Sequence, residues 1–143
     1  MERGAELSVQ GQHETDSSFS GTGSNRGGGA HSAAGGVGDG YTIDDASTPY
    51  GSIYAPTSRG ASGGDGGAGG STIKIDAAIF QLDGILNANG ADSETGGGGS
   101  GGSVYVVARS FDGLGTIKAE GGVTTQSNAG NLSSLFSSTL TCF

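Results

Sequence analysis

The chain has 143 residues, 32 of them glycine, and a formal net charge of −8 at pH 7. Val, Ile, Leu and Phe together supply only 25 residues, a share in the range of disordered chains, which argues against an ordinary globular core. Six Lys and Arg against fourteen Asp and Glu leave no basic patch for nucleic acid or an anionic membrane surface, and no run of 18 apolar residues predicts a transmembrane helix.

The first segment, residues 1–11, is expected to be the end of a repeat unit. Its opening residues contain no apolar run of the kind found in a secretory signal. Three residues of the span 4–11 match later positions of the chain, in the pairs Leu7–Leu86, Val9–Ala88 and Gly11–Gly90. We therefore expect residues 4–11 to be a partial unit, and the chain to be a fragment of a longer protein.

Residues 12–69 are polar and rich in glycine, and we expect them to form a Gly-rich loop and an insertion in the repeat. Three of the four tyrosines (Tyr41, Tyr50 and Tyr54) and both prolines fall within residues 41–60, which favours an ordered loop there. The sequence 35–41 resembles the nonapeptide of calcium-binding β-rolls, but Asp39 stands one position early and the motif does not recur. We interpret it as a turn, and the nearby Asp44 and Asp45 as a solvated acidic loop rather than a cation site.

The central feature is a repeat, in which residues 70–90 and 101–121 align without a gap at a spacing of 31 positions. The identical pairs are Gly70–Gly101, Ala77–Ala108, Phe80–Phe111, Gly84–Gly115, Ala88–Ala119 and Gly90–Gly121. Apolar and polar residues alternate over 72–77 and 103–108, which predicts strands with one buried face. Second strands are predicted at 84–90 and 115–121, with the two phenylalanines filling the corner between the strands of each unit.

A gapless repeat of this length predicts a solenoid, in which each unit covers the apolar face of its neighbour. A helical solenoid is disfavoured, because glycine interrupts every stretch longer than thirteen residues between 60 and 123. The predicted fold class is therefore all-β: a short right-handed parallel β-helix with coils of about 31 residues. The predicted repeat region is 1–123, with complete units at 70–100 and 101–123, Gly-rich loops and the Tyr/Pro-containing insertion.

The tail, residues 124–143, departs from the repeat and is rich in Ser and Thr. Its apolar spacing fits an amphipathic cap helix with Asn131 as N-cap, and a frayed, non-native end fits it equally. Asn131 also opens a formal N-glycosylation sequon, which has meaning only in a secreted chain. The lone Cys142 excludes an intrachain disulfide framework.

No catalytic, cofactor-binding or metal-binding residue is predicted, and no cofactor. His13 and His31 are the only histidines, and their spacing supports no zinc site. His31 and Ser32 are adjacent, which is too little to indicate nucleophilic catalysis. Four charged residues could gather on one outer face, as in β-helical polysaccharide lyases, although a solvated charged surface is the favoured interpretation: Lys74, Asp76, Arg109 and Asp112.

Several motifs together resemble a repeated module of very large surface and extracellular proteins. They are the Gly-Gly-Ala-His run ending at His31, the sequence Tyr50-Gly51-Ser52 followed by a Pro and Gly63-Gly64, and the paired Ile/Val strands that end in Asn-Gly or Glu-Gly-Gly. The resemblance covers roughly residues 4–123. It implies a Gly-rich parallel β-helix segment of a longer, extracellular or cell-surface chain, and it brings no catalytic residues.

Two functions from different classes are consistent with these features. The first is a non-catalytic structural or adhesive module, not an enzyme, whose partners are neighbouring repeats or like chains bound end to end. The second is a carbohydrate-binding or carbohydrate-active β-helix, in which tyrosines would supply platforms for sugars: Tyr41, Tyr50, Tyr54 and Tyr105. Neither involves nucleic acid or insertion into a membrane.

Overall fold

The structure, a computed structural model, describes residues 6–8, 21–23, 27–35, 47–52 and 54–124. All regular structure in these ranges is β, and they contain no helix. The strands in them are β1 (Glu6–Ser8), β2 (Thr72–Gln81), β3 (Ile85–Asn87), β4 (Ser103–Asp112) and β5 (Thr116–Lys118). The all-β prediction is therefore confirmed for the described part of the chain.

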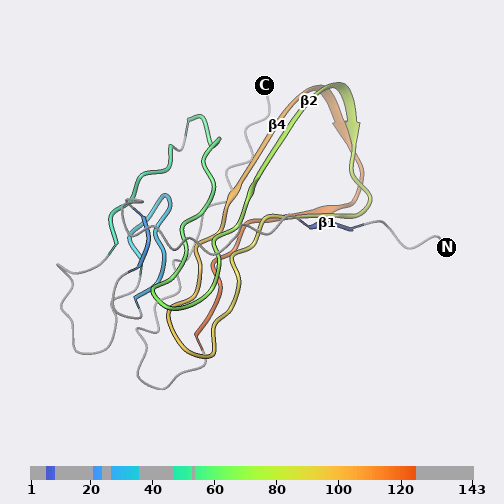
Figure 1. Cartoon of the computed structure of the whole chain (residues 1–143). Coiled ribbons are helices and arrows are strands. Elements are labelled where there is room, and N and C mark those ends of the chain that lie inside the picture. The colour runs from blue at the N-terminus through green and yellow to red at the C-terminus, as the bar shows by residue number, and fades with distance from the viewer. Residues whose placement is uncertain (1–5, 9–20, 24–26, 36–46, 53, 125–143) are drawn as a thin grey trace.

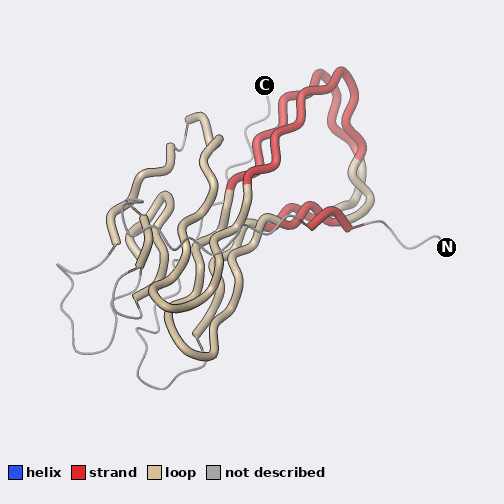
Figure 2. The backbone as a smooth tube through the Cα atoms, viewed as in Figure 1, coloured by secondary structure: helices blue, strands red, loops and turns tan. Residues whose placement is uncertain are grey.

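The strands form two small parallel sheets (Figures 1 and 2). One sheet contains β1, β3 and β5 in that order, and the other contains β2 and β4. Ile75 lies opposite Val106 in the second sheet, and Leu86 lies opposite Ile117 in the first. The repeat alignment found in the sequence is thus the pairing register of both sheets. Leu7 lies opposite Leu86, which confirms that pair of the predicted partial unit.

The strand boundaries differ from the predicted ones. β2 and β4 each run for 10 residues, so Phe80 and Phe111 lie within paired strands, with ring centroids 5.3 Å apart, and do not fill a corner. The corners are made by residues 82–84 and 113–115, where the amide of Gly115 donates to the carbonyl of Leu82. β3 and β5 are correspondingly short, with 3 residues each.

A small apolar core lies on the inner faces of the two sheets. In β2 the exposure alternates, with Ile73 buried and Lys74 and Asp76 exposed, as the period-2 pattern predicts. The buried apolar residues that contact one another are Ile73, Leu82, Leu86, Ala88, Val104, Val106 and Ala119. Two of these seven residues are alanine, so the area of apolar surface that the core buries is small.

The Gly-rich segments lie outside the strands, as predicted for loops, and form a second buried region. Residues 96–102, which we call the central glycine segment, are buried along their whole length. Their backbone hydrogen-bonds to four neighbouring segments: Gly29 N donates to Gly98 O, Gly67 N to Gly97 O, Gly99 N to Ala91 O and Gly122 N to Gly99 O. In Figure 2 these segments run side by side as loops, since their backbone hydrogen bonds do not form the continuous ladder of a β-sheet.

The spacing of these segments leaves no room for side chains. A Cβ atom added at Gly97 would approach backbone atoms of Gly27 and Gly28 to less than 3.0 Å, and one at Gly99 would meet the backbone of Ala68 in the same way. Real Cβ atoms do not come so close to a backbone that cannot move aside. Glycine is therefore required here by the close approach of neighbouring chains.

Polar side chains connect the two units at intervals of 31 residues. The carboxylate of Asp83 accepts a hydrogen bond from the amide of Leu114 (3.2 Å), and that of Asp92 accepts one from Val123 (2.7 Å). Between them, the side-chain oxygen of Asn89 accepts from the amide of Glu120 (2.8 Å). Each bond satisfies a backbone donor of the second unit outside its strands, so it fixes the register where no ladder does.

Replacing Gly97 by Ala tests the packing of the central glycine segment. The added methyl group meets backbone on a neighbouring segment, and the displacement also strains the bond from Gly67 N to Gly97 O. We expect a loss of about 3 kcal/mol in unfolding free energy, measured by urea denaturation followed by circular dichroism. The reverse change at an exposed site, Ala55→Gly, is the control and should cost about 1 kcal/mol or less. Equal losses would show that the segments tolerate a side chain.

Candidate functional site

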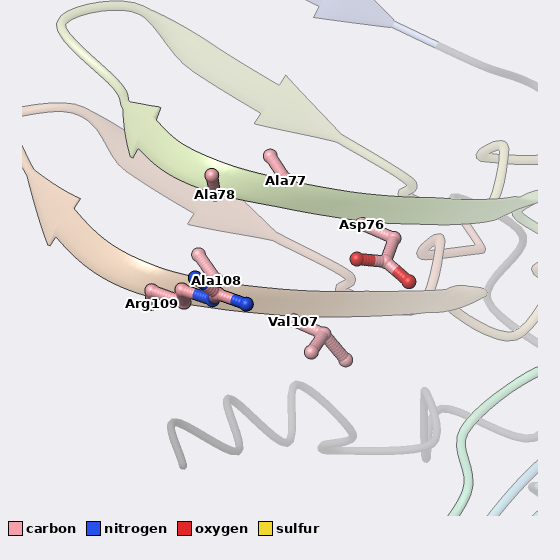
Figure 3. Close-up of a pocket in the computed structure, with 6 residues that line it drawn as sticks. All are labelled: Asp76, Ala77, Ala78, Val107, Ala108 and Arg109. Carbon is pink, nitrogen blue, oxygen red and sulfur yellow. The ribbon is translucent and has the colours of Figure 1, made fainter.

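A charged hollow lies on the outer face of β2 and β4 (Figure 3). It has a volume of about 440 Å³ and is lined by Asp76, Ala77, Ala78, Val107, Ala108 and Arg109. Asp76 stands opposite Val107, and Ala77 opposite Ala108, so two adjacent strands supply three residues each. The side chains of Asp76 and Arg109 are exposed, and no ion pair between described residues neutralises either of them.

The structure brings together only part of the charged cluster considered from the sequence. Asp76 and Arg109 share the hollow, whereas Lys74 lies beside it with its ammonium 6.0 Å from the ring centre of Tyr105. Asp112 is at the far end of β4, where its carboxylate accepts a hydrogen bond from the amide of Gly113. The hollow therefore offers one carboxylate and one guanidinium, groups that can exchange hydrogen bonds with hydroxyl groups.

A second cluster surrounds His31, for which the sequence supported neither a zinc site nor nucleophilic catalysis. The imidazole is buried, with 4 % of its surface exposed. The ring of Tyr50 meets it edge-on, with centroids 5.3 Å apart, and the amides of Tyr50 and Gly51 both donate to the carbonyl of His31 at 2.9 Å. A Cβ atom at Gly51 would lie about 3 Å from the imidazole ring, so this position must be glycine for the ring to fit.

The hydrogen bonds of His31 determine its tautomer. Its Nε2 lies 3.1 Å from the carbonyl oxygen of Ser58, and a carbonyl can only accept, so Nε2 carries the proton. Nδ1 is then the bare nitrogen, and it is buried without a hydrogen-bond partner. Desolvation by burial lowers the pKa of His31 from 6.5, and the bond to Ser58 opposes this effect in part. Because the pKa is lowered, the ring is neutral near pH 7.

Ser103 lies beside this imidazole but is not arranged as a nucleophile. Its Oγ is 3.4 Å from His31 Nε2, which resembles a Ser–His pair. However, the hydroxyl donates to the carbonyl of Ser58 at 2.6 Å, and a protonated Nε2 has no lone pair to accept it. Ser103 is also only 1 % exposed, out of reach of a substrate. The pair therefore ties the segment around Ser58 to the start of β4.

Tyr50 belongs to the same structural cluster and is not a surface platform. Its hydroxyl donates to the carbonyl of Arg59, and burial raises its pKa to about 12, against a smaller opposing effect of the Arg59 charge. Of the other tyrosines considered as sugar platforms, Tyr54 is exposed and Tyr105 is half-buried beside Lys74. Tyr41 lies outside the described residues.

The remaining residues considered from the sequence also lie outside the described residues. They are His13, Asp39, Asp44, Asp45, Asn131 and Cys142. Among the residues that the structure does describe, no three His, Cys, Asp or Glu side chains come together as metal ligands would. The same part of the chain has no helix of the length and apolar character that a membrane span requires.

The sequence did carry a signal for the His31 cluster. The runs that end at His31 and begin at Tyr50 were the motifs of the resemblance to surface-protein modules, and the structure places them in contact. What the sequence lacked was a reason for two short motifs 19 residues apart to meet. Comparisons of the chain with protein families, with curated proteins and with solved structures find no match.

The buried imidazole makes stability depend on pH. Because the folded-state pKa of His31 lies below that of the unfolded chain, near 6.5, its contribution is present above pH 6.5 and is lost as pH falls towards the folded-state pKa. We expect the unfolding free energy to decrease between pH 7.5 and 5.5, measured by urea denaturation. His31→Asn should remove most of this slope, while His13→Asn should keep it. An unchanged slope in the His31 variant would mean that other groups cause it.

Proposed function

We propose that the chain is a non-catalytic structural or adhesive repeat module of a cell-surface or extracellular-matrix protein, and a fragment of a longer polypeptide. The observation that carries this proposal is the shared 31-residue register of β2 with β4 and of β3 with β5. Because partner residues are 31 positions apart in both sheets, the repeating element is the whole unit of two strands and not a single strand. Units of this kind stack into extended rods, whose usual role is to span distance and present a surface.

We propose further that the repeat continues as a right-handed parallel β-helix with coils of about 31 residues. Parallel strands joined by crossover connections are right-handed in nearly all proteins, because the strand twist favours that hand. The side-chain bonds from Asp83, Asn89 and Asp92 to the next unit support a stack with fixed register. An acidic exterior, with a net charge of −8, would keep a long rod soluble by repulsion between chains.

The modular part of this proposal predicts that one more unit can be added. In a chain with a second copy of residues 72–102 inserted between Gly102 and Ser103, the added strand 72–81 would pair with β2 on one side and with β4 on the other. We expect the enlarged chain to fold and to melt at a higher temperature, since each added interface stabilises a stack. An insertion of the same length with scrambled sequence is the control. Unfolding caused by both insertions would contradict a stacking repeat.

The location part is tested on cells of the source organism with an antibody against the chain. Labelling of intact cells that external protease removes is the expected result. Labelling only after the cells are opened would contradict a surface or matrix role.

A carbohydrate-binding function is the second candidate, and the hollow between Asp76 and Arg109 favours it. The two charged groups can accept hydrogen bonds from, and donate them to, the hydroxyls of a sugar ring. A neutral glycan fits better than an acidic one, because the chain is itself strongly acidic.

This candidate predicts retention of the chain by neutral glucose hexasaccharides, measured by affinity electrophoresis and by calorimetry. Asp76→Asn and Arg109→Gln should each weaken binding about tenfold, because each removes a charge-assisted hydrogen bond. Glu94→Gln, an exposed carboxylate away from the hollow, is the matched control and should bind as the wild type does. No retention, or equal binding by all variants, would remove the candidate. A reducing-sugar assay on the same glycans separates binding from turnover.

A further inference from the structure

The two sheets end at different levels on one side of the molecule. β2 runs into β3 through residues 82–84, and β4 runs into β5 through residues 113–115, so each pair of strands forms one layer across both sheets. β1 lies on the side of β3 that faces away from β5. The first sheet therefore has a layer, that of β1, for which the second sheet has no strand among the described residues.

Among the described residues, only β4 pairs with β2, and it does so on one of the two edges of β2. No described residue pairs with the side of β2 that faces away from β4, over the 10 residues from Thr72 to Gln81. An unpaired strand edge of this length presents a row of amides and carbonyls that a further strand can bond. β1 pairs with β3 and so extends the neighbouring sheet by one strand. The position next to β2 is therefore adjacent to β1.

We propose that this open edge is the docking site of one extended strand of about ten residues, supplied by the preceding repeat of the same longer polypeptide and lying parallel to β2. This proposal rests on the proposed function as a repeat module. The strand would pair with β2 as β2 pairs with β4, and would complete the layer that contains β1. It would also cover the side of β2 that otherwise invites association with other chains.

A second copy of this chain does not fit the same position. Its exposed end would be the layer of β4 and β5, which advance together by the same register. To place its β4 beneath β2, the copy would have to place its β5 where β1 already lies. Because β1 already occupies the position beside β3, a single strand fits beside β2 and a complete layer of two strands does not. This argues against the end-to-end pairing of like chains at this end.

The β2–β4 pair indicates the sequence that the strand requires. Ile73 and Ile75 face Val104 and Val106, so the docked strand needs aliphatic residues at the same two positions. Phe80 stacks on Phe111 at 5.3 Å, which favours an aromatic residue opposite Phe80. Thr72 lies opposite the buried Ser103 in β4, which by analogy favours a small residue opposite Thr72 in the docked strand.

The test is a chain in which residues 72–84 are copied directly in front of Glu6, in place of residues 1–5. This reproduces the native spacing, because three residues separate β2 from β3 and β3 begins at Ile85, the partner of Glu6. We expect the melting temperature to rise by about 5 °C or more and the β2 amides to exchange hydrogen more slowly. The added strand should also suppress any concentration-dependent association seen by sedimentation.

The matched control carries the same added segment with its alternation shifted: Ile73→Lys, Lys74→Ile, Ile75→Asp and Asp76→Ile in the added copy only. A shift by one residue turns the apolar side chains outward, so no stabilisation is expected. Equal stabilisation by both segments, or none by either, would overturn the proposal. If the inserted 72–102 unit stabilises the chain while the added strand does not, the docking site fails and the repeat module stands. If the inserted unit fails as well, both fail.

Discussion

The structure depends on the close approach of glycine backbones in and around the central glycine segment. Residues 96–102 contact four other segments through direct backbone hydrogen bonds, at distances where a Cβ would meet main-chain atoms. Glycine ordinarily weakens regular structure, because it loses more conformational entropy on folding than other residues do. Here that loss is offset by hydrogen bonds that only glycine-rich chains can approach closely enough to make.

This packing explains how a chain with so few apolar residues keeps a defined fold. The apolar core joins two small sheets and ends at short side chains such as Ala88 and Ala119. Beyond it, buried serines continue the interior: Ser100 is 1 % exposed, and its hydroxyl donates to Ala30 O and accepts from Ala61 N. The interior is therefore polar in one half and apolar in the other, and the 31-residue register connects the two.

The cluster around His31 gives the insertion its place in this arrangement. The imidazole packs against Tyr50 and Gly51, and its Nε2 and the hydroxyl of Ser103 both donate to the carbonyl of Ser58. Ser103 opens β4, so these bonds fix the insertion to the repeat itself. The buried Nδ1 is the cost of this arrangement, because no donor among the described residues replaces the hydrogen bond that this nitrogen would accept from water.

The sequence by itself determined where the strands lie, the inner face of Thr72–Ala77 and the register, because alternation and a gapless repeat are local and periodic properties. It also marked His31 and Tyr50 as a pair of motifs. It did not determine where the strands end. Only the tertiary structure decided that residues 96–102, which form no strand, are a buried centre and not an exposed loop, since a run of glycine has the same appearance in both settings. It likewise decided that Asp76 and Arg109 share a hollow while Asp112 does not, because the length of β4 sets that distance. Contacts between segments far apart in the chain depend on how backbones stack, and no single segment records that.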